Sequence, residues 1–200
     1  MENVAALSLL RNRINSLEEN VFHNMPKLKF LNLANNDLGE SPKARVSPLA
    51  FRSTSLRRID LSSNNKFKRK GDLKNIFRNI QQPTAFYLEK CPASSAYREA
   101  FQNLKSLSTL IVREVVNFDR YAGRSMFTNL SSLKYLYLAR NDLKSLDSRM
   151  FDGMKSLKQS DVHSNRFTTV TAEYLPVKVQ ARLRRVDFSD NPFVCDCNII

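Results

Sequence analysis

Two histidines, His23 and His163, are the residues best suited to acid–base chemistry in this 200-residue chain. His163 stands close to Asp161 in the sequence and is either an inert exposed side chain or a pH-sensitive contact. Neither histidine is accompanied by a Ser or Cys nucleophile with a glycine loop that would bind an oxyanion. The chain has four glycines and no glycine-rich phosphate loop. The sequence therefore predicts a protein that is not an enzyme and that uses no cofactor.

Cysteines are the next candidates for holding a chemical group. Cys195 and Cys197 form a Cys-x-Cys pair, and such a pair can bind a metal ion. Because no further ligand cluster accompanies it, we predict no metal site.

The stretch from 133 to 143 shows which elements must position these residues. Leu136, Tyr137 and Leu138 alternate as in a short strand with one buried face. An α-helix would turn Leu138 away from the face that holds Leu136. Asn141 follows, and its amide can replace backbone hydrogen-bond partners in a tight turn. One such unit cannot bury its own apolar face, so it needs copies.

Eight copies of this unit follow one another along the chain. Their first positions lie 24 to 28 residues apart, at Val4, Leu28, Leu56, Pro83, Leu107, Leu133, Leu157 and Leu183. The pattern L-x-x-L-x-L-x-x-N-x-L resembles that of leucine-rich repeat proteins of the longer, extracellular type. The resemblance implies an α/β fold, a curved solenoid of about eight repeats. Its parallel strands would line the concave face, with loops or short helical turns outside.

A fixed repeat also predicts one stack of units without internal domain boundaries. We predict the solenoid over residues 1–190, followed by residues 191–200, which resemble the opening of a cysteine-rich C-terminal cap. In that cap two later cysteines would pair with Cys195 and Cys197, which implies an oxidising compartment. The chain starts without a signal peptide and stops before those partners, so we expect a fragment of a larger protein.

The middle repeats are irregular, which is typical of Toll-like receptor ectodomains. Pro83 replaces the first Leu of the fourth repeat, and Cys91 in its Asn position is predicted to be a buried free thiol. Val115 occupies the same position in the fifth repeat. Because Val cannot satisfy the turn's backbone groups, the hydrogen-bond ladder should break there unless a neighbour or water substitutes. In the seventh repeat Ser160 replaces a core Leu.

Side chains between the inward leucines form columns across the concave face, because strands in a sheet lie about 4.8 Å apart. Exposed tyrosines on such a face are frequent at protein interfaces. The predicted ligand-binding patch consists of Tyr87, Ile111, Tyr135, Tyr137, Phe30 and Arg58. The alternative is that the tyrosines only stack across strands, and both interpretations can hold together.

A formal net charge of +13 favours acidic protein surfaces and polyanions as partners. The alternative is that scattered basic residues only solvate the outer side of the solenoid. Arg57 and Arg58 are separated from Arg184 and Arg185 by five strand steps, about 24 Å. This exceeds the Debye length of about 8 Å, so the two pairs are not expected to act as one anion site.

Two other surface sites stand out. A basic loop at Lys66, Lys68, Arg69 and Lys70 either contacts an acidic partner or is simply solvated. Asn129 opens the sequon Asn129-Leu130-Ser131, so it is a glycosylation candidate in a secreted protein.

We therefore predict a non-enzymatic protein-recognition module similar to part of a Toll-like receptor ectodomain. That resemblance implies a protein or microbial ligand, receptor homo- or heterodimerisation, and a place at the extracellular face of the plasma membrane or in the endosomal lumen. The alternatives are a secreted or tethered adhesion or matrix protein, and a binder of nucleic acid or heparin. The chain contains no apolar run long enough for a membrane span.

Overall fold

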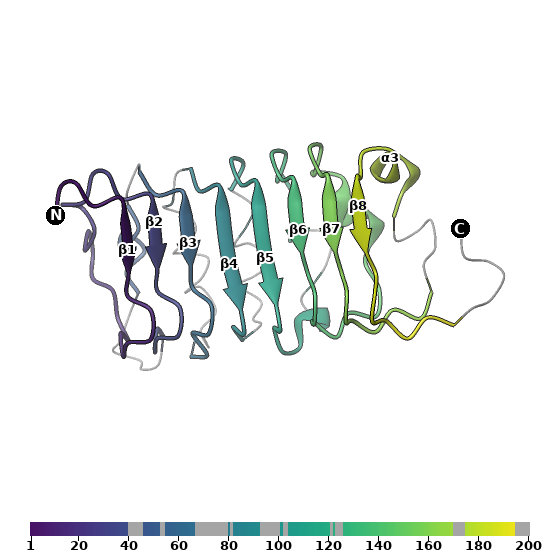
Figure 1. Cartoon of the computed structure of the whole chain (residues 1–200), viewed down its shortest axis with the longest axis horizontal. Helices are drawn as coiled ribbons and strands as arrows, with labels where there is room; N and C mark the ends of the chain where they lie inside the picture. The colour runs from purple at the N-terminus through teal and green to yellow at the C-terminus, as the bar shows by residue number, and fades with distance from the viewer. Residues whose placement is uncertain are drawn as a thin grey trace.

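The computed structural model shows eight parallel strands in one sheet, in the order in which they occur in the sequence (Figure 1). It describes residues 1–39, 46–52, 55–66, 80, 82–92, 101, 104–120, 122, 126–169 and 175–194. The strands are β1 (Ala6–Ser8), β2 (Phe30–Asn32), β3 (Arg58–Asp60), β4 (Ala85–Glu89), β5 (Thr109–Arg113), β6 (Tyr135–Tyr137), β7 (Gln159–Asp161) and β8 (Arg185–Asp187). One strand comes from each predicted repeat, so the leucine-rich repeat solenoid is confirmed.

The second residue of each strand from β2 to β6 points into the core. Leu31, Ile59, Phe86, Leu110 and Leu136 stand in register and have no exposed surface. Ser160 continues this row and is also buried. The flanking residues of each strand point the other way, onto the concave face.

The return segments on the other side of the core are built from phenylalanines and short helices. Phe22 packs on Phe51 with ring centroids 6.1 Å apart, and Phe101 packs on Phe127 at 5.9 Å. The helical segments are η1 (Phe118–Arg120), η2 (Ser148–Phe151) and α3 (Val177–Gln180). In the described part of the chain, no helix is both long and apolar enough to cross a membrane.

Every repeat makes the same turn after its strand, whatever its sequence. The residue before the Asn position has a positive φ between 52° and 58° in all eight repeats, at Arg11, Asn35, Ser63, Lys90, Glu114, Arg140, Ser164 and Asp190. This left-handed conformation is uncommon outside glycine. The irregular fourth and fifth repeats adopt it too, so the turn is imposed by stacking on the neighbours.

Buried asparagines join consecutive repeats in a ladder. Asn64 donates to the carbonyl oxygens of Leu61 in its own repeat and Leu33 in the preceding one, and accepts from the Leu38 amide. Asn165 bonds in the same way to Leu138 and Val162.

At Val115 the sixth repeat completes the ladder, which is the substitution by a neighbour that the sequence analysis named as the alternative to a break. The Asn141 side chain accepts from the Val115 amide at 2.9 Å and donates to the Val112 carbonyl at 2.6 Å. Toward the fourth repeat, β4 and β5 pair over five residues instead of three, which adds the pairs Leu88↔Val112 and Glu89↔Arg113. Backbone pairing therefore extends where the side-chain ladder has no asparagine.

Candidate recognition surface

Four of the predicted ligand-binding residues lie together on the concave face of β4, β5 and β6. Tyr87, Ile111 and Tyr137 form one row, with each residue in direct register with the next. Tyr135 stands two residues before Tyr137 on the same face and is 37% exposed. The other three side chains are half-buried. The structure thus brings these four residues into one patch, which we call the tyrosine patch.

Phe30 and Arg58 do not join the tyrosine patch. They are paired with each other across β2 and β3, and Ala85 and Thr109 separate Arg58 from Tyr135 in the same row. The predicted surface is therefore two separate groups, because the intervening repeats carry small residues at this position.

A chain of polar contacts holds one side of the tyrosine patch. The Arg113 guanidinium lies over the Tyr137 ring, 5.2 Å from its centroid. The same group forms an ion pair with the carboxylate of Asp161 at 3.0 Å. His163 contacts the other oxygen of that carboxylate, with its Nδ1 2.6 Å away. Sequence reasoning paired Asp161 with His163 but missed Arg113, which reaches across β6 from β5.

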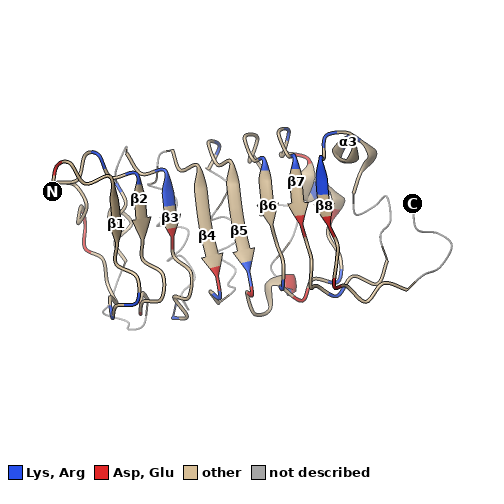
Figure 2. Ribbon diagram, in the orientation of Figure 1, with Lys and Arg blue, Asp and Glu red and all other residues tan. Residues whose placement is uncertain are grey.

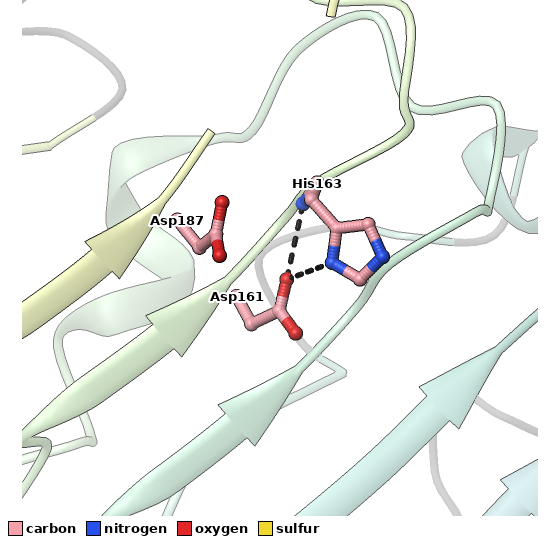
Figure 3. A group of neighbouring side chains, drawn as sticks. All are labelled: Asp161, His163 and Asp187. Carbon is pink, nitrogen blue, oxygen red and sulfur yellow. Dashed lines mark hydrogen bonds and ion pairs between the residues drawn. The ribbon is translucent and has the colours of Figure 1, made fainter. Parts of the chain in front are cut away.

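Asp187 lies beside this pair and completes a group of possible metal ligands (Figure 3). One ligand atom from each of Asp161, His163 and Asp187 lies within 4.8 Å of the others. The sequence analysis did not expect this group, although Asp161 and Asp187 occupy equivalent strand positions and pair in register. An incoming cation would have to compete with Arg113 for Asp161, so the arrangement works as an ion-pair network.

The row of Tyr87, Ile111 and Tyr137 continues on both sides into carboxylates and an amide that close the turns after their strands. Asn32, Asp60, Asp161 and Asp187 each accept a hydrogen bond from the backbone amide two residues later. Hydrogen bonds from the hydroxyl and amide of Ser189 lower the pKa of Asp187. These four residues are therefore structural. Tyr87, Ile111 and Tyr137 occupy the same row and are available for contact.

Charge is divided between the two ends of the strands (Figure 2). Basic residues gather where strands begin, at Lys29, Arg57, Arg58, Lys134, Lys158, Arg184 and Arg185. Acidic residues gather where strands end, at Asp60, Glu89, Asp161 and Asp187. Two basic residues at the latter edge are paired there, since Lys90 and Arg140 form ion pairs with Glu114 at 3.5 and 3.4 Å.

The remaining predicted sites fall elsewhere. Lys66 forms an ion pair with Asp37 at 3.2 Å, while Lys68, Arg69 and Lys70 lie outside the described residues. Cys195 and Cys197 also lie outside them. Asn129 is exposed, next to the buried Leu130. Cys91 is a buried free thiol, as predicted.

The chain belongs to the leucine-rich repeat family. Residues 3–122 match the family model described as a BspA type leucine-rich repeat region of six copies, and residues 122–167 match a leucine-rich repeat model. The predicted resemblance to Toll-like receptor ectodomains is confirmed at the level of the fold by two solved complexes.

One of these is the Drosophila Toll–Spatzle complex, at 19% identity and a TM-score of 0.69 over 96% of this chain and 27% of that chain. The other is the mouse RP105/MD-1 complex, at 19% identity and a TM-score of 0.70 over 97% of this chain and 31% of that chain. A curated relative, trophoblast glycoprotein of Macaca fascicularis, is 26% identical over 98% of this chain. The chain spans 44% of that relative's length.

Proposed function

We propose that this chain is a non-enzymatic protein-recognition module of a receptor of the Toll-like type, and that its ligand contacts the tyrosine patch. The observation that carries the proposal is the row of Tyr87, Ile111 and Tyr137 with Tyr135 beside it. Large amphipathic rings on a rigid sheet lose little conformational entropy on binding, which favours a strong contact. The Arg113 guanidinium, which is paired with Asp161, lies over the Tyr137 ring and would restrict its motion before a ligand arrives.

The two structural neighbours agree with a protein ligand, since each was solved in complex with a protein partner, Spatzle or MD-1. By the same resemblance we place the parent protein at the extracellular face of the plasma membrane or in the endosomal lumen, where it would form receptor dimers. A secreted or tethered adhesion protein with the same repeats is the alternative, and it would use the same tyrosine patch.

A polyanion is the second candidate ligand. The net charge of +13 and the basic edge at the strand starts favour it. The two candidates differ in salt dependence, because polyanion binding releases counterions and weakens steeply with salt. Contact through tyrosines would change little over the same range of salt.

A site-specific photo-crosslinker tests the protein-ligand proposal. Benzoylphenylalanine would replace Tyr135, and the labelled chain would be applied to an array of secreted and cell-surface proteins. We expect one partner to crosslink from this position. The matched control carries the crosslinker at Val21, a residue of similar exposure (47%) in the first return segment. Equal crosslinking from both positions would refute the tyrosine patch as the contact. Undiminished crosslinking from position 135 in a Tyr137→Ala background would refute it as well.

A further inference from the structure

A pocket of about 400 Å³ lies at the basic edge of the sheet, at the starts of β2, β3 and β4. It is lined by Lys29, Phe30, Arg57, Arg58 and Thr84. Backbone hydrogen bonds fix the spacing of its walls, because the Arg57 amide donates to the Lys29 carbonyl at 2.8 Å and the Thr84 amide to the Arg57 carbonyl at 2.7 Å. The pocket is therefore part of the rigid sheet edge.

Three of its five lining residues are cationic. Within the part of the chain that the structure describes, no carboxylate forms an ion pair with Lys29, Arg57 or Arg58. The Arg57 side chain donates a hydrogen bond to the Gln82 carbonyl at 3.1 Å, a neutral partner that does not compensate its charge. Cations that line one pocket repel one another, and a bound anion would relieve that repulsion.

The shape and lining favour an anion that is attached to a ring. Pockets of 300–1,000 Å³ hold small organic ligands rather than bare ions. Phe30 supplies an aromatic wall beside Arg58, its partner in register. Guanidinium groups bind sulfate and phosphate oxygens with paired, charge-assisted hydrogen bonds.

We infer that this pocket binds a sulfate or phosphate ester carried on an aromatic or sugar ring. The anion lies between Arg57, Arg58 and Lys29, and the ring lies against Phe30. The site is separate from the tyrosine patch and does not depend on the proposed protein ligand.

Calorimetric titration with p-nitrophenyl sulfate and p-nitrophenyl phosphate tests the inference. We expect each ester to bind more tightly than the corresponding inorganic ion, sulfate or phosphate. We expect p-nitrophenol to bind more weakly than either ester. The ratio of the two ester affinities identifies which anion the pocket prefers. No binding of either ester at millimolar concentration, or equal affinity for the ester and the inorganic ion, would overturn the proposal.

Matched variants separate the pocket from the general field of the basic edge. Replacing Arg57 and Arg58 by Gln should weaken ester binding about tenfold or more. The control replaces Lys134 and Lys158 by Gln, which removes the same charge from the same edge but from residues that do not line the pocket. Its affinity should change less than about twofold, since these residues lie beyond the Debye length. Equal losses in the two variants would overturn the pocket.

Two single substitutions keep the test valid if the double variant folds poorly. Arg58→Lys retains the charge but loses the planar fork, so we expect a partial loss of affinity. Phe30→Leu should abolish the advantage of the esters over the inorganic ions while leaving inorganic ion binding unchanged. Tyr135→Ala should leave ester affinity unchanged, so failure of one proposal does not imply failure of the other. A full effect of Tyr135→Ala on ester binding would refute the assignment.

Discussion

The Asn141 amide lies 2.6 Å from the Val112 carbonyl oxygen and joins the sixth repeat to the fifth, which has Val115 where an asparagine is expected. This contact gives the buried backbone groups of the irregular fifth repeat a hydrogen-bond partner from its regular neighbour. The sixth repeat therefore supplies hydrogen bonds that the irregular fifth repeat cannot make with its own side chain.

Replacing Asn141 by Ala should destabilise the protein strongly. It would leave the amide of Val115 and the carbonyls of Val112 and Leu138 without this partner in a buried site. We expect a loss of about 3 kcal/mol or more in the free energy of unfolding, measured by urea denaturation. Asn12 occupies the same position in the first repeat, where it is exposed, so Asn12→Ala should cost less than about 1 kcal/mol. Equal costs would contradict the ladder.

Neighbouring residues of β6 should respond in opposite ways to truncation. Leu136 is fully buried, so Leu136→Ala should cost about 2–5 kcal/mol. Tyr135 is exposed on the concave face, so Tyr135→Ala should cost less than about 1 kcal/mol while removing the proposed contact. Thermal melting of both variants checks the assignment of faces, and a reversed order would contradict it.

Arg113→Ala should loosen the tyrosine patch. The substitution removes the cation over the Tyr137 ring and the ion pair with Asp161, whose side chain is 10% exposed. Because Arg113 itself is 30% exposed, we expect a cost of only about 1–2 kcal/mol. The matched control is Arg149→Ala, which breaks an exposed ion pair with Asp147 and should cost clearly less, because water screens an exposed pair. Chemical denaturation compares the two, and an equal loss would argue against the network.

The Cys91 thiol should make stability fall at high pH. Burial raises its pKa to about 12 from the ordinary value of 9.0. Ionisation therefore favours the unfolded chain between these values, so this contribution is complete below pH 9 and is lost as the pH rises toward 12. Urea denaturation at pH 8 and pH 10.5 would measure it in chains with Cys195 and Cys197 replaced by Ser.

The comparison for that experiment is Cys91→Val in the same background, because other groups also titrate in this range. The original thiol should lose more stability than the valine variant on going to pH 10.5. An identical loss in both chains would show that Cys91 is not the group responsible.

Expression through a secretory pathway should attach a glycan to Asn129, which is exposed and opens a sequon. Treatment with a glycosidase should then shift the protein to lower mass, and Asn129→Gln should abolish the shift. Ser131→Ala destroys the same sequon without altering Asn129 and should give the same result. A glycan that persists in either variant would place the modification elsewhere.

Sequence alone predicted the strands, their inward leucines and the rows across the concave face. The physical reason is that the repeat pattern fixes both the face and the register, so Tyr87, Ile111 and Tyr137 had to fall in one row. The buried thiol of Cys91 followed from the same pattern.

Tertiary structure decided which side chains from different strands meet. Arg113 passes Tyr137 to reach Asp161, 48 residues away, because its long side chain spans more than one strand step. The pocket lined by Lys29, Arg57 and Arg58 likewise forms only where the starts of three strands stack side by side. A repeat pattern gives the row of each residue, but the direction and reach of its side chain depend on the neighbours against which it packs.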